Sequence, residues 1–366
     1  MKLLTGLSFL LSLVTAFAQN DSPARQAAKH FMRGANCANF LEVPPGQNWA
    51  VPHTAADLKA MRDEGFDHVR LPVGWHHYAG PGPEFKLSDE IFGKVDDMVT
   101  NATALGLNIM LNIHHFNEFT SDPAANTEEF YAIWRQIAAH YAKAPEGVAF
   151  ELLNEPKDAA KTTVMNPIYA ETIRQIRQTN PRRVIFVGPG MWNSANELKD
   201  LQLPEADRNL IVTVHCYDPF QFTHQGATWV GNDRKVTGIK FPGPPEKPLV
   251  PDPGLGLSEK TLDWIKRYNT LPADENPCGP KAFRAMIDKA RAWSEQNGRP
   301  IHFGEFGAYT KADQDSRARF YRAFRQALDE AGMGWAIWDW KSGFNYWDDK
   351  AKQPLPGMRE ALFPKK

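Results

Sequence analysis

VAFELLNEP, residues 148–156, is a short apolar run that stops at a proline. Its length and its apolar character predict a strand buried on both faces, as in a parallel sheet. Pro156 cannot donate to a strand ladder, so the strand is expected to end before it. Asn154 and Glu155 would then stand at the carboxyl end of this strand.

Runs of this kind recur along the chain, with amphipathic helical stretches such as 54–64 and 88–105 between them. The eight predicted strands are 33–38, 68–72, 108–114, 148–154, 183–187, 210–217, 300–305 and 334–339. Strands that alternate with helices indicate parallel βα units. Eight units without a break in composition predict an α/β fold of one domain, a (β/α)8 TIM barrel. Residues 34–37 are not the Gly-rich phosphate turn of an open doubly wound sheet.

The first eighteen residues have the pattern of a secretory signal peptide. Lys2 precedes an apolar run at 3–14, and Ala16-Phe17-Ala18 offers a small-x-small cleavage site. The run is too short to be a membrane span. We expect cleavage after Ala18, a secreted or periplasmic location, and one mature domain, 19–366. The alternative is a buried helix.

The composition of the chain indicates which classes of binding partner to expect. The 366 residues carry a formal net charge of −1, so nucleic acid is not an expected partner, nor is a membrane once the leader is removed. Three cysteines, Cys37, Cys216 and Cys278, leave at least one thiol free, so no disulfide framework is expected. Eleven tryptophans suit a neutral sugar, because indole stacks on its apolar face.

A second candidate carboxylate lies, like Glu155, at the carboxyl end of a predicted strand. Glu305 closes the apolar run at 300–305, the seventh strand. In a barrel the carboxyl ends of strands four and seven share one face, so the two glutamates can meet across a substrate bond. Paired carboxylates are what glycosidic hydrolysis needs, because one group protonates the leaving oxygen and the other carries negative charge.

The residues at the ends of most of these predicted strands resemble sequence motifs of glycoside hydrolase family five, the cellulase-type barrel enzymes. The matching positions are 34–42 with Asn39, Arg70, His114, His115, Asn154-Glu155-Pro156, His215-Cys216-Tyr217, Glu305 within 304–307, and Trp338. The resemblance implies a retaining mechanism with Glu155 as general acid and base and Glu305 as nucleophile, without cofactor or metal.

The resemblance also assigns roles to neighbours of the two glutamates. Arg70 and Tyr217 would favour the charged form of Glu305, whereas desolvation would help Glu155 hold its proton. Asn154 would bind the sugar 2-hydroxyl. Trp338 would form the apolar floor beneath the reacting sugar, and His114 and His115 would bind its hydroxyl groups. His215 would contact the acid, Glu155, and Asn39 would have a supporting role. Cys216 should point away from the cleft by strand alternation.

Aromatic residues on the loops after the strands are candidates for sugar stacking, with plain packing as the alternative. They are Trp49, Trp75, Trp192 and Trp229. Trp229 belongs to a proline-rich stretch, 219–256, that forbids continuous helix or sheet. Because it follows the sixth strand, it is predicted to form a wall of the substrate groove. A solvated insertion without a role is the alternative.

The expected activity is that of an endo-β-1,4-glucanase acting on β-glucan, with a monomer as the expected state. A β-mannanase, a xyloglucanase or a mixed-linkage glucanase would share this site and differ in the loops. A non-catalytic carbohydrate-binding protein is a further alternative, which the presence of both glutamates disfavours. A metallohydrolase could draw on His114, His115, His215, His302 and Glu305, but the first strand lacks the His-x-His pair usual in such barrels.

Overall fold

The computed structural model describes residues 22–364 of the chain. The predicted signal peptide, residues 1–18, lies outside the described residues, so its cleavage stays a prediction. Within the described part of the chain, no helix is both long enough and apolar enough to cross a bilayer.

Eight parallel strands close into one barrel in sequence order, with β8 pairing with β1. The strands are β1 (Arg33–Asn36), β2 (His68–Leu71), β3 (Asn108–Asn112), β4 (Val148–Glu151), β5 (Ile185–Val187), β6 (Leu210–His215), β7 (Ile301–Phe306) and β8 (Gly334–Ile337). The predicted (β/α)8 barrel is confirmed, and each strand begins within two residues of its expected start. Several ends were predicted too late. β4 stops at Glu151 because the following residues leave the ladder to form the rim of the barrel.

The end of the barrel where the strands begin is sealed by apolar packing. Ala24 of α2 (Pro23–Ala28) and Phe31 form a buried cluster with Met110, Phe186 and Ile211. The rings of Phe31 and Phe186 meet edge to face with centroids 5.3 Å apart. This packing closes the lower mouth of the barrel, so the functional cleft must lie at the carboxyl ends of the strands.

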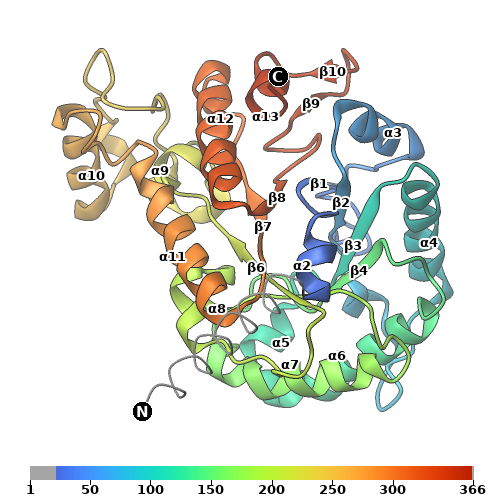
Figure 1. The fold of residues 1–366 in the computed structure, drawn as a ribbon. Coiled ribbons are helices and arrows are strands. Elements are labelled where there is room, and N and C mark those ends of the chain that lie inside the picture. The colour runs from blue at the N-terminus through green and yellow to red at the C-terminus, as the bar shows by residue number, and fades with distance from the viewer. Residues whose placement is uncertain (1–21, 365–366) are drawn as a thin grey trace, which may run out of the picture.

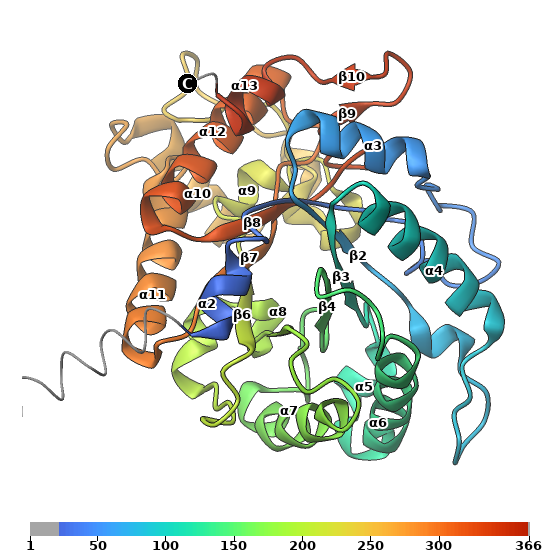
Figure 2. The same cartoon turned by 45° about the vertical axis from the view of Figure 1, so that its right-hand side comes forward.

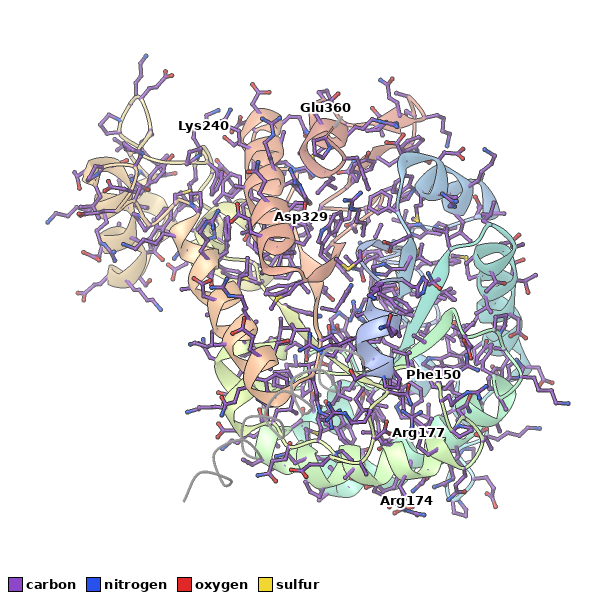
Figure 3. All side chains as sticks on the ribbon, viewed as in Figure 1. Phe150, Arg174, Arg177, Lys240, Asp329 and Glu360 are labelled. Atoms are coloured by element: carbon purple, nitrogen blue, oxygen red, sulfur yellow. The ribbon has the colours of Figure 1, made fainter. Side chains whose placement is uncertain are left out.

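Helices surround the barrel and cover its outer face (Figures 1 and 2). The main ones are α3 (Ala55–Glu64), α4 (Asp89–Ala104), α6 (Pro123–His140), α7 (Thr162–Arg177), α11 (Lys281–Asn297) and α12 (Gln314–Ala331). The predicted helices 54–64 and 88–105 are therefore confirmed as α3 and α4. Charged side chains such as Arg174, Asp329 and Glu360 lie on the outside of this layer (Figure 3). The apolar core lies between barrel and helices.

Short elements, together with the 12-residue helix α10, complete the loops. They are η1 (Trp75–Tyr78), α5 (Asn117–Ser121), α8 (Gly190–Asn193), η2 (Ala195–Asp200), α9 (Phe220–Thr223), η3 (Thr228–Val230), η4 (Asn232–Arg234), η5 (Pro253–Leu255), α10 (Glu259–Thr270), β9 (Trp347–Asp348), β10 (Gln353–Pro354) and α13 (Met358–Leu362). The stretch 219–256 contains only one-turn pieces, as predicted. It is tied to α10, where the Asn269 side chain accepts from Leu249 N at 2.8 Å and donates to its carbonyl at 2.9 Å.

Candidate active site

A cleft of about 1170 Å³ opens at the carboxyl ends of the strands. Most of the residues singled out from the sequence line it, and they come from the ends of different strands, as barrel active sites require. Those residues are Asn39, Trp49, His114, His115, Asn154, Glu155, Trp192, His215, Tyr217, Trp229, Glu305 and Trp338.

Glu155 and Glu305 face each other across this cleft. Glu155 follows β4 in a left-handed conformation, with φ of 47°, which turns its side chain out of the strand direction. Nδ1 of His215 lies 2.9 Å from Glu155 Oε1 and 3.6 Å from Glu305 Oε2. One oxygen of each carboxylate and this nitrogen all lie within 4.8 Å of one another. Such proximity matches the carboxyl separation of about 5–5.5 Å in retaining glycosidases and is too short for the ~6.5–9.5 Å of inverting ones.

A bulge in β7 aims Glu305 into the cleft. Val214 of β6 pairs with Phe303, but the next residue, His215, pairs with Glu305, so Gly304 is the extra residue. A Cβ at Gly304 would stand 2.6 Å from Thr213 Oγ1, so the close approach of β6 requires glycine. The bulge places the Glu305 carboxylate opposite His215.

Arg70 of β2 is the buried cation beneath the site. It binds Glu151 through two bonds, from Nε at 2.6 Å and from Nη2 at 2.7 Å. Its Nη1 donates to Glu305 Oε1 and to Asn36 Oδ1, each at 2.8 Å, and its Nη2 donates to Asn154 Oδ1 at 2.8 Å. One guanidinium therefore fixes three of the strand ends around the cleft, which its planar fork of five donors allows.

The two glutamates differ in the groups around them. Burial raises the pKa of Glu155 to about 7, and Arg70 and Lys157 oppose the rise only in part. Burial also raises the pKa of Glu305, but His215 and Arg70 act against that rise. Tyr217 adds a bond from its hydroxyl to Glu305 Oε2 at 2.7 Å, the contact expected from the sequence. Glu305 is thus the better stabilised of the two as an anion.

His215 is held as a neutral donor to Glu155. Burial lowers the pKa of His215 to about 4. Its Nε2 lies 3.3 Å from Nδ2 of Asn193, and an amide N–H can only donate there. The ring proton then sits on Nδ1, which donates to Glu155 Oε1. Asn193, which lies in a left-handed turn with φ of 55°, was not found from the sequence.

Three polar groups and one ring are positioned for a sugar beside the glutamates. Nε2 of His114 and Nδ2 of Asn154 are buried and have no hydrogen-bond partner among the described residues. The ring of Trp338 stacks parallel to that of His114, with centroids 5.6 Å apart. His115 lines the cleft together with His114 because its φ of 53° breaks the strand alternation.

A protein-family model matches most of the chain. The family model described as Cellulase (glycosyl hydrolase family 5) matches residues 26–343, nearly the whole described chain. The chain belongs to glycosyl hydrolase family 5.

Several proteins similar to this chain are named endoglucanases. Endoglucanase H of Acetivibrio thermocellus is 28% identical over 84% of this chain, and Endoglucanase 3 of Fibrobacter succinogenes is 29% identical over 87%. The chain spans only 29% and 51% of the length of these two relatives. The solved structure of endoglucanase Cel5A from Thermotoga maritima is 32% identical, with a TM-score of 0.81 over 93% of this chain and 100% of that one.

Trp75 does not belong to the family 5 cleft, which corrects the stacking role predicted for it. Its side chain is fully buried, and its Nε1 donates to the carbonyl of Asn112 at 3.0 Å. The one-turn helix η1 begins at Trp75 and turns the indole toward the helix layer, where its ring packs against Phe92. Trp49, Trp192 and Trp229, in contrast, line the cleft and are 44%, 48% and 59% exposed.

The five residues considered as metal ligands do not come together. His302 points into the lower barrel, where its Nε2 lies 3.1 Å from that of His68. Among the described residues, the group that could hold an ion is Glu155, His215 and Glu305. The structure already engages each of these side chains in hydrogen bonds, including the bonds of His215 to Glu155 and of Tyr217 to Glu305.

Several residues of the site received no role from the sequence, although Asn36 and Glu42 lie in the matched opening 34–42. Glu151 and Asn36 bind Arg70, and a charged residue inside the apolar run of β4 was the available signal for Glu151. Glu42 accepts from the backbone N–H groups of Asn39 and Phe40 and so fixes the turn that presents Asn39. Further lining residues are Met191, Ser194, Asp218, Phe220, His224, Val230, Met286, Asp339 and Phe344.

All three cysteines are free and buried. Cys216 follows the last residue of β6 and lines the edge of the cleft next to Asp218, although alternation was expected to turn it away. Burial raises the pKa of each thiol, which keeps them protonated.

Proposed function

We propose that this chain is a retaining glycoside hydrolase that cleaves β-linked glucan as an endo-β-1,4-glucanase. The observation that carries the proposal is the placement of Glu155 and Glu305, whose nearest oxygens lie together with His215 Nδ1 within 4.8 Å. The names of the relatives, Endoglucanase H and Endoglucanase 3, support the substrate class.

In the first step Glu305 attacks the anomeric carbon while Glu155 gives its proton to the leaving oxygen. The glycosidic bond breaks, an ester forms between the sugar and Glu305, and the leaving sugar departs with the proton. In the second step Glu155, now ionised, takes a proton from water, and the resulting hydroxide breaks the ester. Two inversions at one carbon restore the β configuration.

The surrounding groups prepare both glutamates for these steps. Arg70 and Tyr217 hold Glu305 with bonds of 2.8 and 2.7 Å to its two oxygens, which keeps it charged and directed. Nδ2 of Asn154 donates to the sugar 2-hydroxyl, and Nε2 of His114 meets another hydroxyl. Trp338 supports the apolar face of the reacting ring.

A β-mannan is the second candidate substrate. A solved structure of Thermotoga maritima Cel5A, 32% identical to this chain, is described as a complex with a mannotriose substrate. Glucose and mannose differ only in the configuration at C2, which is the position that Asn154 would contact. Xyloglucan and mixed-linkage β-glucan complete the set of polymers for the test.

The test is reducing-sugar release by residues 19–366 and by Glu305→Gln on carboxymethylcellulose, mixed-linkage β-glucan, xyloglucan and glucomannan. We expect the wild type to cut at least one polymer and the variant to lose at least about 10³-fold in rate, because the nucleophile is absent. Polymer binding by both proteins with cleavage by neither would favour a carbohydrate-binding protein instead. The preferred polymer identifies the substrate.

Export is a second part of the proposal. It is supported by Lys2, the apolar run at 3–14 and the cleavage pattern ending at Ala18. The mass of the protein isolated from the periplasm or medium should be that of a chain that begins at Gln19. A protein that stays in the cytoplasm with residues 1–18 attached would contradict export.

A further inference from the structure

We infer that Asp218 is a specificity-determining residue that binds hydroxyl groups of the sugar on the leaving-group side of the cleft. The ligand class is a neutral pyranose unit of the polysaccharide chain. This inference rests on the proposed function and deepens it, because it concerns the half of the cleft that Glu155 serves and that the mechanism above leaves undescribed.

Part of the cleft lining comes from the loops that follow β5 and β6 and from Met286 of α11, and we call this part of the lining the side arm. Strand alternation explains the arm, since His215 and Tyr217 face the carboxylates while the residues between and after them face the other side of β6. The side arm is lined by Met191, Ser194, Cys216, Asp218, Phe220 and Met286.

One hydrogen bond and the strand order place the side arm on the leaving-group side. Trp192 N donates to the carbonyl of Pro156 at 3.1 Å, so the loop after β5 lies against the residue that follows Glu155. Glu155 gives its proton to the leaving oxygen, and the leaving sugar must therefore lie next to this loop. Asn39 and Trp49, which follow β1, lie across the eight-stranded barrel from β5 and serve the other end of the substrate.

The surroundings of Asp218 leave its carboxylate available to a ligand. The structure gives it one partner among the described residues, the backbone N–H of Phe220. The described residues that line the cleft include no lysine and no arginine, so no cation neutralises it there. A carboxylate has about four acceptor positions, and two neighbouring sugar hydroxyls can donate to it. Met191, Phe220 and Met286 provide apolar surface for the C–H faces of the ring.

The charge of Asp218 also predicts what the side arm rejects. Glu155, Asp218 and Asp339 are all carboxyl groups of this cleft. A carboxylated sugar bound against Asp218 would meet like charge, which disfavours binding. The side arm therefore selects unmodified sugar units.

The experiment compares two substrates that differ in the leaving group. Cellopentaose places a sugar in the side arm, whereas an aryl β-cellobioside places an aromatic ring without hydroxyl groups there. For Asp218→Ala we expect the ratio of kcat/KM for cellopentaose to kcat/KM for the aryl glycoside to fall about 10-fold, the size of one lost charge-assisted hydrogen bond. Asp218→Asn keeps an acceptor for Phe220 N–H and should lower the ratio less.

The control is Glu246→Gln, which removes a carboxylate from the stretch that follows Asp218, 219–256, at an exposed position outside the cleft. Its ratio should equal that of the wild type. Equal losses on both substrates in the Asp218 variants would reveal a merely structural role and overturn the inference, as would no loss on either. If the wild type cleaves neither substrate, the proposed function itself fails, and the inference fails with it.

Discussion

At the scale of single residues, the two glutamates of the site differ in the hydrogen-bond donors that surround them. Glu305 receives bonds from Arg70 and Tyr217, whereas Glu155 receives one from His215. Both carboxyl groups are desolvated, and desolvation alone would keep both protonated. The additional donors around Glu305 support the proposed difference between Glu305 as nucleophile and Glu155 as acid.

This difference predicts the pH dependence of kcat/KM. The free glutamate pKa of about 4.3 would leave Glu155 ionised at neutral pH. Because burial raises the pKa of Glu155 to about 7, its acid form persists to near neutrality, and activity should fall as the pH rises through about 7. Protonation of Glu305 should lower activity on the acid side. A pH profile of kcat/KM on cellopentaose measures both limbs.

The matched control is Glu155→Gln on an aryl glycoside whose phenolate departs without a proton. There kcat/KM reports only the attack of Glu305, so the limb near pH 7 should vanish while the acid limb stays. An unchanged limb near pH 7 in this variant would assign that limb to another group.

At the scale of elements, the sequence predicted strand positions well and side-chain directions at the strand ends less well. Apolar runs located all eight strands, since burial on both faces leaves a continuous pattern. Local backbone conformations were not visible in that pattern. His115 enters the cleft through a positive φ, and Glu305 is aimed by a bulge at Gly304. Neither the positive φ nor the bulge can be predicted from residue spacing.

Trp75 illustrates why position after a strand is a weak guide. It follows β2 as closely as Trp192 follows β5, yet η1 turns it into the core, and only Trp192 reaches the cleft. Arg70 and Tyr217, in contrast, contact Glu305 as expected, because the direction of a side chain within or next to a strand follows the alternation. Partners contributed by distant strands, such as Glu151 for Arg70, require the closed barrel to be known.

Substitution of Trp229 should therefore affect substrate binding, whereas substitution of Trp75 should affect stability. Trp229→Ala removes an exposed indole of the stretch 219–256 that meets the Tyr309 ring edge to face at 4.9 Å. It should raise KM on polymer about 5-fold through lost stacking while stability stays near that of the wild type. Trp75→Ala should lower the free energy of unfolding by about 3–5 kcal/mol, because it opens a cavity in the core.

Urea unfolding and KM on the preferred polymer, measured for both variants, check this contrast. Trp75→Ala should keep the wild-type KM at temperatures where it remains folded. A Trp229 variant with unchanged KM would mean that the loop is a solvated insertion and not a wall of the groove.

At the scale of the whole molecule, closure of the barrel is what brings the two glutamates together. β4 and β7 are three strands apart in the ring, and their carboxyl ends converge on one cleft only because β8 pairs with β1. Arg70 then links β2 to β4 and β7 from below. The separation of the carboxylates is therefore a property of the closed ring, since changes in single loops leave the positions of the strands unchanged.

The stereochemistry of the first product tests that separation directly. The nearest oxygens of Glu155 and Glu305 lie within 4.8 Å of each other, which matches the short separation of retaining enzymes and not the ~6.5–9.5 Å at which inverting enzymes accommodate a water. Cleavage of cellopentaose, followed by proton NMR within the first minutes, should show the β-anomer before mutarotation produces the α-anomer. Early α-anomer would mean that water attacks directly, and that Glu305 acts as a base instead of a nucleophile. With a 2-fluoro aryl glycoside, which slows the second step, the mass of the protein should rise by one glycosyl unit, and the label should map to Glu305 and be absent in Glu305→Gln.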